Sequence, residues 1–397
     1  MIGRGLTWRL GAGQLISWGV TYYLIGVLGQ PIADEFGWSQ TKVHGGFAAA
    51  LLTMGLASPF AGALIDRHGG RPAMVAGALV GALGCLGLAL AYETAGYYAA
   101  WIVLGLAMRL TLYDAAFAAL ARIGGRDARR SMSQITLLGG LASSVFWPIG
   151  HGLADAFGWR AAALVYAACA LVSAALYAGI PDRRFEPPTA GATLHPPPRA
   201  TTRRDVGLAG ALYALVTTIA SFLAAGMSSA MVALMIGLGV APGTAVALAA
   251  LRGVSQSAAR LCEVAFGARI DPTLLNLIAA AGLAASFVLG LMSGLSALAA
   301  AGFCALYGAG NGLATIVRGS LPLALFEPRD YARLTGRLVA PSFLAAAAAP
   351  LFYAYAIETF GAGPALAAST ALGAVAIAAA IWLMLRFGPE RPPSRPS

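Results

Sequence analysis

A short charged turn at residues 62–71, Gly-Ala-Leu-Ile-Asp-Arg-His-Gly-Gly-Arg, separates two long apolar runs and constrains this chain most strongly. The run before it, residues 43–65, is almost free of charge, and the run after it, residues 72–91, carries none. Each run reaches the roughly 20 residues that a helix needs to cross the hydrocarbon core of a bilayer. A turn with one acid and two arginines cannot lie in hydrocarbon, so we expect a tight loop at a membrane face.

Composition extends this reading to the whole chain. Of its 397 residues, 59% are hydrophobic and only 11% are charged, whereas soluble domains are about 25% charged. The apolar runs have helical length, not the alternating pattern of barrel strands, and there is room for about twelve helices. We predict an all-α integral membrane protein with two pseudo-symmetric six-helix bundles. The predicted spans are residues 7–30, 43–65, 72–92, 97–121, 132–154, 160–180, 207–236, 243–266, 273–293, 296–320, 338–357 and 363–386.

The net charge of +10 follows membrane topology and does not indicate a nucleic-acid partner. Arginines gather in the turns on the same side as residues 62–71, at 122–130, 199–204 and 329–337. The opposite turns carry only Lys42 and Arg160 as basic residues, beside several acids. Positive residues favour the cytoplasmic side. We therefore predict a multi-pass protein of the cell inner (plasma) membrane with both termini in the cytoplasm.

A polar stretch rich in proline and arginine divides the chain. We predict an N-terminal bundle at residues 1–180, a cytoplasmic linker with little fixed structure at 181–205, a C-terminal bundle at 206–386 and a cytoplasmic tail at 387–397. Internal repetition supports the division, because Gly-Ala-Leu-Ile-Asp at 62–66 recurs as Gly-Ala-Arg-Ile-Asp at 267–271, 205 residues later. Repeated helical halves, with the substrate between them, are how many secondary transporters are built.

Ionisable residues inside the spans are the candidate site, because a charge in the bilayer core is costly. Arg109 and Arg252 lie near the middle of their spans, too deep to reach the interface comfortably. The planar arginine fork matches carboxylate or phosphate oxygens, so one such arginine in each half favours an anionic substrate. Alternatively, an internal acid neutralises each one. Asp114 is the obvious partner for Arg109, but five residues along an α-helix it points about 140° away.

Four further residues are assigned to proton coupling or gating: Asp114, Glu263, Arg260 and Arg318. Asp114 and Glu263 are the acids well inside predicted spans, and a buried carboxylate can carry a proton through a conformational cycle. The alternative is structural pairing, since Arg260 lies three residues before Glu263 on one helix face. Arg318 lies close enough to a helix end to reach water.

Polar residues elsewhere in the spans complete the predicted substrate site. Gln14 and Tyr22 lie on the first helix, Gln256 lies one turn after Arg252, and Asn311 lies in a glycine-rich part of the tenth span. The aromatic residues could instead be interfacial anchors. The four cysteines and four histidines form no close cluster or nucleophile–base set, and no nucleotide-binding loop is present. We therefore predict no metal, no cofactor, no catalytic residue and no enzyme activity.

The turn at 62–71 resembles the signature loop of the major facilitator superfamily, G-x-x-x-D-R-x-G-R-R, and departs from it at Gly70. The matching residues are Gly62, Asp66, Arg67, Gly69 and Arg71. The resemblance implies a twelve-helix secondary transporter that works by alternating access, commonly as a monomer. Stretches at 37–39, 251–256 and 311–319 look like the monocarboxylate-porter branch. In that branch an arginine on the eighth helix is associated with the substrate carboxylate, and Arg252 falls at the matching place.

We predict a proton-coupled transporter of a small organic anion, expected to be a carboxylate, whose partners are its substrate, protons and membrane lipid. The first alternative is a proton-driven efflux antiporter for drugs or toxic molecules. Two export patterns are incomplete here, because residues 147–152 lack the glycine before Pro148 and residues 111–113 do not continue an R-x-x-Q-G motif after Arg109. The second alternative, a membrane sensor or lipid enzyme, lacks an output domain or a catalytic cluster.

Overall fold

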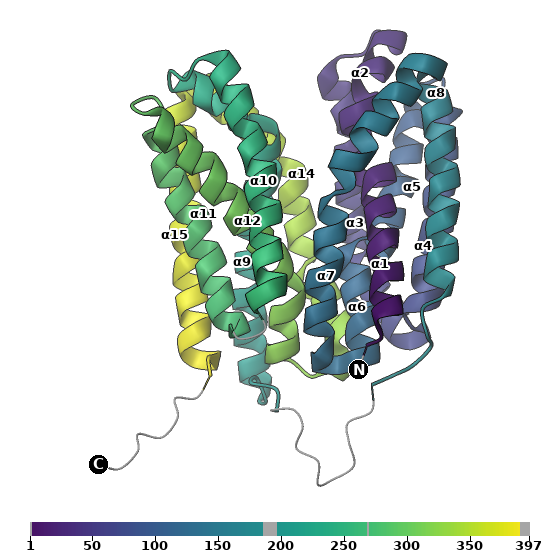
Figure 1. Ribbon diagram of the computed structural model, residues 1–397, viewed down its shortest axis with the longest axis vertical. Helices are drawn as coiled ribbons and strands as arrows, with labels where there is room; N and C mark the ends of the chain where they lie inside the picture. The colour runs from purple at the N-terminus through teal and green to yellow at the C-terminus, as the bar shows by residue number, and fades with distance from the viewer. Residues whose placement is uncertain (1, 186–196, 268–269, 390–397) are drawn as a thin grey trace. The chain divides into compact units, whose positions relative to one another are not determined.

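The computed structural model describes residues 2–185, 197–267 and 270–389, and its regular elements within those ranges are helices (Figure 1). The predicted all-α membrane fold is confirmed. Nine helical stretches of the described chain are long and apolar enough to cross a membrane, and one of them, Thr94–Ala178, contains two of the predicted spans and most of a third. Helix α10 (Pro242–Phe266) falls outside that group because Arg252, Arg260 and Glu263 interrupt its apolar sequence.

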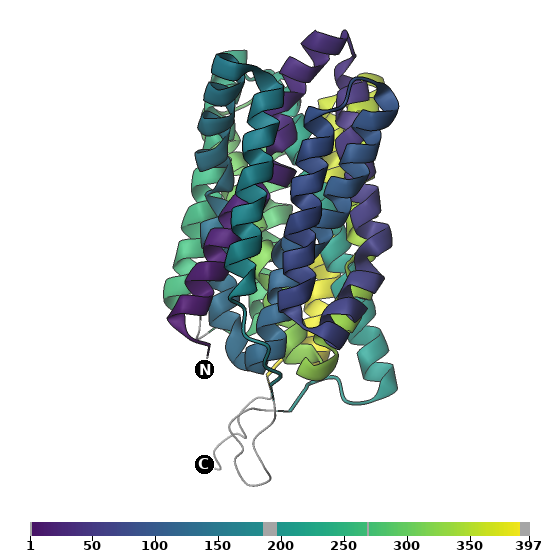
Figure 2. The ribbon, with the colours of Figure 1, turned by 90° about the vertical axis from the view of Figure 1, so that its right-hand side faces the viewer.

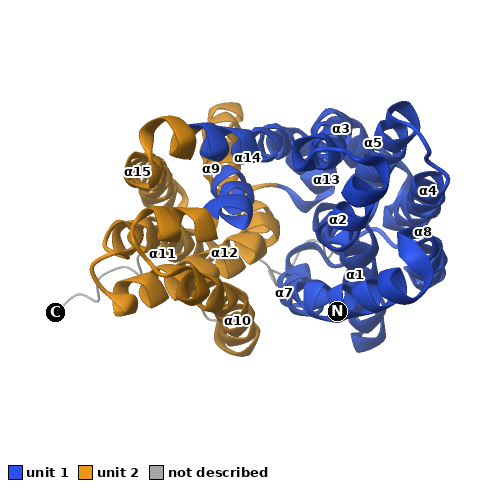
Figure 3. Cartoon of the chain, turned by 90° about the horizontal axis from the view of Figure 1, so that it is seen from above, with its two compact units in different colours: residues 1–196, 221–230, 327–355 blue, residues 197–220, 231–326, 356–397 orange. Residues whose placement is uncertain are grey.

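Two compact units divide the chain, coloured separately in Figure 3. Unit 1 comprises residues 1–196, 221–230 and 327–355, and unit 2 comprises residues 197–220, 231–326 and 356–397. The units follow packing rather than chain order, so the boundaries at 180, 205 and 386 stay a prediction. Helix α9 (Arg203–Gly237) and helix α14 (Ala340–Phe360) each contribute to both units.

Unit 1 contains the first eight α-helices and a short segment from late in the chain. The purple and blue helices of this unit run side by side in both Figure 1 and Figure 2. Its elements are α1 (Arg4–Ser17), the π-helix η1 (Trp18–Tyr22), α2 (Leu24–Phe36), α3 (Gln40–His68), α4 (Gly70–Ala89), α5 (Thr94–Thr111), α6 (Tyr113–Gly124), the 3-10 turn η2 (Gly125–Asp127), α7 (Ala128–Gly140), α8 (Ala142–Ala178), the 3-10 turn η4 (Pro328–Asp330) and α13 (Tyr331–Leu338). Helix α8 covers the second part of the predicted span 132–154 and most of the span 160–180, and Gly158 separates the two parts with φ 80° and ψ 157°.

Three predicted spans of unit 1 are interrupted, and one of them, residues 132–154, divides between α7 and α8 at Leu141. The first contains a π-helical turn at Trp18–Tyr22, and such turns are frequent at functional sites. The fourth breaks at Leu112, whose backbone is extended with φ −75° and ψ −173°. The break leaves the Thr111 carbonyl available to another helix, and Gln14 Nε2 donates a hydrogen bond to it over 2.6 Å. Irregular backbone at membrane depth is tolerated where other protein groups satisfy it, as here.

Unit 2 is built around α10, α11 (Pro272–Leu291), α12 (Ala297–Leu325) and α15 (Ala362–Phe387). Helix α12 packs against both α10 and α11, and α11 packs against α15. Proline at the first position and an N-cap residue begin α11, because the Asp271 carboxylate accepts a hydrogen bond from the Thr273 N–H over 2.9 Å.

The two ends of the predicted linker are ordered by backbone hydrogen bonds. Phe185 N donates to Arg122 O over 2.6 Å in unit 1, and Ala200 N donates to Leu325 O over 3.0 Å in unit 2. Residues 186–196, where we predicted little fixed structure, lie outside the described residues.

Candidate functional site

A polar face on α10 meets a polar face on α12 inside unit 2. Arg252, Gln256, Arg260 and Glu263 follow one another along α10 at helical spacings of four, four and three residues. Residues at such spacings share one face of a helix. We call the following set the α10–α12 polar face: Arg252, Gln256, Arg260 and Glu263 of α10, with Asn311, Thr315 and Arg318 of α12.

Glycines of α12 let the two backbones approach closely along this face. A Cβ atom added at Gly308 would lie 2.2 Å from the carbonyl oxygen of Arg252, and one at Gly312 would lie 2.6 Å from that of Gln256. One turn further on, Arg260 Nη2 donates a hydrogen bond to Thr315 Oγ1 over 3.3 Å. The contact points advance together in both helices, so α10 and α12 run parallel and in register.

Burial increases toward one end of the α10–α12 polar face. Arg260 and Glu263 are only 5% and 6% exposed, whereas Arg252 and Asn311 are half-buried. The structure therefore brings together the following residues that the sequence predicted for substrate binding or coupling: Arg252, Gln256, Arg260, Glu263, Asn311 and Arg318.

A second polar cluster lies between α1, α5 and α8 in unit 1. Gln14 is fully buried, and its Nε2 lies 2.6 Å from Thr111 O and 3.3 Å from the Tyr177 hydroxyl. Ser17 Oγ lies 2.9 Å from the same hydroxyl. The hydrogen bonds fix the Gln14 amide within the helix packing and support the break after Thr111.

Aromatic rings continue this cluster along the π-helical turn. The Trp18 ring centroid lies 4.9 Å from that of Tyr22 and 4.7 Å from that of Tyr113, and Tyr22 packs edge-on against Phe47 at 5.0 Å. Trp18 and Tyr22 are half-buried. Asp114, the residue after Tyr113, is also half-buried and lies in the first turn of α6.

Arg109 lies in a buried contact among α5, α3 and α13. Its side chain is 3% exposed, and Nε donates a hydrogen bond to Ser58 Oγ over 2.8 Å. The Ser58 hydroxyl in turn donates to Gly336 O over 2.7 Å. Arg109 therefore reaches α13 through Ser58, an arrangement suited to controlling how α3 meets α13.

The predicted signature loop makes a further contact with α13. Asp66 Oδ2 accepts a hydrogen bond from the backbone N–H of Arg333 over 2.7 Å. Arg333 lies in the first turn of α13, where free N–H groups and the helix dipole favour a carboxylate. A Cβ atom at Gly62 would lie 2.2 Å from Ala332 O. The loop thus joins α13 by a hydrogen bond at Asp66 and by close backbone approach at Gly62.

The remaining signature residues occupy the turn between α3 and α4. Gly69 has φ 91°, a conformation that favours glycine, and Arg67 and Arg71 are exposed. Gly70, where the chain departs from the family pattern, is buried. A Cβ atom there would lie 2.3 Å from the Ala119 Cβ atom on α6, so the close packing of α4 and α6 excludes the usual basic residue.

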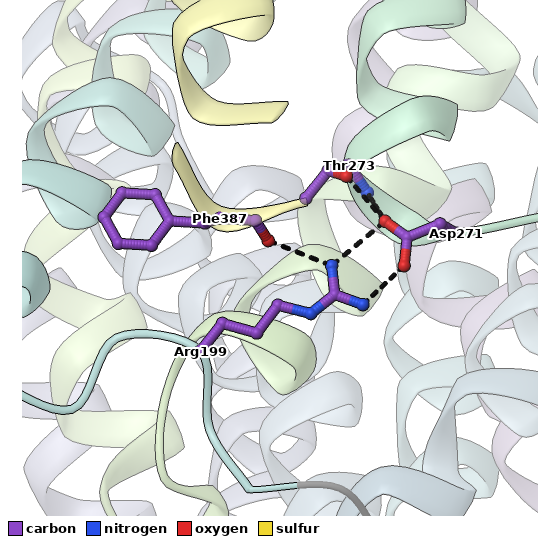
Figure 4. Close-up of polar contacts among 4 residues, drawn as sticks. All are labelled: Arg199, Asp271, Thr273 and Phe387. Atoms are coloured by element: carbon purple, nitrogen blue, oxygen red, sulfur yellow. Dashed lines mark hydrogen bonds and ion pairs between the residues drawn. The ribbon is translucent and has the colours of Figure 1, made fainter. Parts of the chain in front are cut away.

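Asp271, the counterpart of Asp66 in the repeat, is held differently. Arg199, at the end of the linker, approaches it with both terminal nitrogens, at 3.0 Å and 2.5 Å (Figure 4). Arg199 Nη1 also donates to Phe387 O over 3.1 Å, at the end of α15. Asp271 therefore caps its own helix and anchors the linker within unit 2, whereas Asp66 bonds to another helix.

The ionisation of Asp271 contributes to stability in a direction that can be tested. Burial alone would raise the pKa of this carboxyl, but hydrogen bonds from Arg199 and Thr273 outweigh burial and hold the pKa below its ordinary 3.8. A depressed pKa stabilises the folded state above the unfolded pKa, and this stability is lost as pH falls through the folded pKa. Asp271→Asn should lower the free energy of unfolding at pH 7 by about 1.5–3 kcal/mol, the range for hydrogen bonds to charged groups.

Thermal unfolding from pH 7 down to pH 3 measures this effect. The difference in Tm between the wild type and Asp271→Asn should shrink below about pH 3.9, where the unfolded aspartate becomes protonated. Asp155→Asn, at an exposed aspartate of α8, is the control and should leave Tm nearly unchanged. A difference in Tm that persists unchanged at low pH would contradict a role for the Arg199–Asp271 ion pair.

Sequence reasoning missed several partners of the predicted residues. Ser58, Tyr177 and Thr315 look like ordinary small or aromatic helix residues, and none carries a charge or motif that distinguishes it. Arg199 was assigned to the basic cytoplasmic side, but not to Asp271. The one available signal was the repeat. It places Asp271 at the position that corresponds to Asp66, and a half-buried carboxylate there needs a partner of its own.

Comparisons with known proteins identify the family and the fold. The family model described as Major Facilitator Superfamily matches residues 10–316. A relative, the multidrug resistance protein MdtL of Klebsiella pneumoniae strain 342, is 29% identical over 145 residues, which are 36% of this chain and 36% of that protein. The MdtL protein of a second strain, ATCC 700721 / MGH 78578, matches to the same extent.

Solved structures of transporters share the fold along nearly the whole chain. The proton:xylose symporter XylE matches with a TM-score of 0.73 and 14% identity, covering 97% of this chain and 95% of the other. The human organic anion transporter MFSD10 matches with a TM-score of 0.69 and 18% identity, covering 95% and 99%. FucP in an outward conformation matches with a TM-score of 0.71 and 13% identity, covering 95% of this chain and 97% of the other.

Proposed function

This chain belongs to the Major Facilitator Superfamily, and we propose that it is a proton-coupled transporter of a small organic anion, with a carboxylate as the expected substrate. It is a multi-pass membrane transporter and not an enzyme. The proposal places it in the cell inner (plasma) membrane as a monomer, with both termini in the cytoplasm. Protons, membrane lipid and the small-molecule substrate are its partners.

The charge of the α10–α12 polar face carries the proposal. Along these two helices the sequence holds three arginines, Arg252, Arg260 and Arg318, and a single acid, Glu263. Charged side chains at membrane depth are rare and mark substrate or ion pathways by default. The half-buried Arg252 presents a guanidinium group, whose planar fork binds both oxygens of a carboxylate. One solved structure of the same fold is of an organic anion transporter.

Roles for the other residues follow from their positions. Gln256 and Asn311 add neutral hydrogen-bonding groups beside Arg252. In unit 1 the half-buried Tyr22 is proposed to contact substrate, and the fully buried Gln14 is proposed to hold the helices beside it. Glu263, beside Arg260, is proposed to carry the coupled proton, with Asp114 as the second acid. Arg318 is proposed to add a positive charge at the C-terminal end of the α10–α12 polar face, where it would take part in coupling or gating.

Gating is proposed at α13. Asp66 bonds to Arg333 N, and Arg109 reaches Gly336 through Ser58. Both contacts join α13 to earlier helices of unit 1, so an alternating-access cycle that moves α13 must break them together. Arg109 then acts on conformation, and direct contact with substrate is assigned first to Arg252.

Uptake into proteoliposomes under an inward proton gradient tests the substrate class. Labelled monocarboxylates and dicarboxylates, cationic drugs and sugars form the panel. Arg252→Ala should reduce carboxylate uptake by about 30-fold or more, since losing a charged hydrogen bond costs roughly 2–5 kcal/mol. Arg252→Lys should restore only part of the rate because an ammonium group cannot bind bidentately. Arg203→Ala, at an exposed arginine, is the control and should transport normally.

A second candidate function is proton-driven efflux of drugs or other toxic molecules. The match to multidrug resistance proteins favours it, over 36% of each chain. The same panel separates the two functions. If cationic or neutral drugs move in exchange for protons and carboxylates do not move at all, drug efflux would replace the anion proposal. Normal carboxylate uptake by Arg252→Ala would retain the substrate class and remove Arg252 from the site.

A further inference from the structure

Three sulfur atoms meet in the core of unit 2, within electrostatic reach of Arg252 on the α10–α12 polar face. Cys304 Sγ on α12 lies 3.9 Å from Met231 Sδ and 3.7 Å from Met235 Sδ, both on α9. Met231 and Met235 are four residues apart, so they lie on one face of α9 and point toward the same neighbour. All three side chains are buried, with exposures of 0%, 3% and 0% for Cys304, Met231 and Met235.

We propose that Cys304, Met231 and Met235 form a binding site for a soft monovalent metal ion, Cu(I) or its analogue Ag(I). Thiolate and thioether ligands select soft ions, whereas carboxylate and carbonyl oxygens suit magnesium or calcium. This site is independent of the anion-transport proposal, because it uses none of the residues assigned to substrate or protons.

The distances from the Cys304 sulfur to the two methionine sulfur atoms fit a three-coordinate ion. A zinc–thiolate bond is about 2.3 Å long, and three metal–sulfur bonds of that length in a plane place their sulfur atoms about 4.0 Å apart. The separations from Cys304 Sγ to the two methionine sulfur atoms, 3.9 Å and 3.7 Å, are close to that value. An ion could therefore enter the cluster with only small movements of the flexible methionine side chains.

The charge balance also suits a buried position. Binding replaces the thiol proton of Cys304 with the metal ion, which forms one metal–sulfur bond and releases one proton to solvent. Neither methionine changes its charge. A monovalent ion that replaces one proton leaves the net charge of the cluster unchanged, so binding adds no charge beside Arg252 and avoids the cost of an isolated ion in the membrane interior.

Ordinary packing of a buried thiol is the competing explanation, and Cys85 provides the comparison. Cys85 in unit 1 is also fully buried, but its thiol donates to a backbone carbonyl, Val20 O, over 3.4 Å. It therefore provides an internal control for a buried thiol outside a sulfur cluster. Cys169 and Cys262 are more accessible and must be removed because they would bind soft metals unspecifically.

The test uses purified full-length protein with Cys85, Cys169 and Cys262 replaced by serine, so that Cys304 is the remaining thiol. Cu(I) is added without oxygen, in competition with a coloured Cu(I) chelator. We expect one ion per chain, and X-ray absorption should show three sulfur ligands at about 2.3 Å. Met231→Leu and Met235→Leu, which conserve volume, should each weaken affinity at least roughly 100-fold, more than is usual for loss of a supporting second-layer group.

Two control proteins show whether Cu(I) binding depends on Cys304, Met231 and Met235. Met74→Leu, at a fully buried methionine of α4, should leave the affinity unchanged. A second protein keeps Cys85 and carries Cys304→Ser, and it should bind no ion in competition with the chelator. If either methionine variant binds Cu(I) as well as its parent, or if absorption shows fewer than three sulfur ligands, the cluster is packing alone. If the triple-serine protein fails to fold, the methionine comparison is made in the wild type with its accessible thiols alkylated.

Discussion

Gly62→Ala is expected to reduce transport to a small fraction of the wild-type rate, although it adds a single methyl group. That methyl would lie 2.2 Å from Ala332 O, a backbone atom that cannot turn away. Overpacking of this kind costs about 1–3 kcal/mol. The cost falls on the state in which α3 contacts α13, and it lowers the population of that state by roughly 5–150-fold. The Asp66–Arg333 and Ser58–Gly336 hydrogen bonds lie in the same contact and should weaken together with it.

Initial uptake rate in proteoliposomes and Tm measure the effect of Gly62→Ala. The control is Gly152→Ala, because a Cβ atom at Gly152 meets no atom within 4 Å. Gly152→Ala should keep the wild-type rate and raise Tm slightly, since alanine favours a helix over glycine by about 1 kcal/mol. Equal rates for the two variants would show that the approach of α3 to α13 does not limit transport.

Gly308→Ala is expected to abolish anion uptake nearly as completely as Arg252→Ala. Its methyl would lie 2.2 Å from the carbonyl oxygen of Arg252 and 3.0 Å from the Arg252 Cα atom. Helix α10 must therefore move away from α12, carrying the Arg252 side chain with it. Displacing a binding group by about 1 Å can cost on the order of 100-fold in rate, so the guanidinium group would be present but misplaced.

The neighbouring Gly253 provides a close control. It follows Arg252 directly on α10, but a Cβ atom there meets nothing within 4 Å. Gly253→Ala should leave uptake intact, while Gly308→Ala loses uptake and also lowers Tm, by roughly 2–4 °C for each kcal/mol. If Gly308→Ala transports normally, the register of α10 against α12 does not position Arg252, and the proposed site must be moved.

Helix positions were largely predictable because a membrane imposes a simple rule. An apolar run near 20 residues has to be a helix, since no water is available to its backbone. The span predicted at 273–293 is α11 at Pro272–Leu291, and the span at 363–386 is α15 at Ala362–Phe387. The breaks at Trp18–Tyr22 and at Leu112 were not predictable, because hydropathy does not change where a helix satisfies its backbone with a side chain from another helix.

The candidate site divides in the same way. A charge within an apolar run is visible in sequence, and the spacing of Arg252, Gln256 and Arg260 already places them on one helix face. Their neighbour across that face is a tertiary fact, decided by where Gly308 and Gly312 allow two backbones to approach. The free-energy cost of a charge in the bilayer therefore identifies the candidate residues in the sequence, and helix packing determines which residues they contact.

The sequence by itself determined the membrane class, the helix positions and the signature loop, because each depends on local hydrophobicity or on a short contiguous motif. Only the tertiary structure decided that Asp66 bonds to α13 while Asp271 bonds to Arg199. The two acids occupy equivalent places in the repeat, so no local pattern distinguishes them. Their difference comes from partners 267 and 72 residues away along the chain, which folding alone brings within hydrogen-bonding distance.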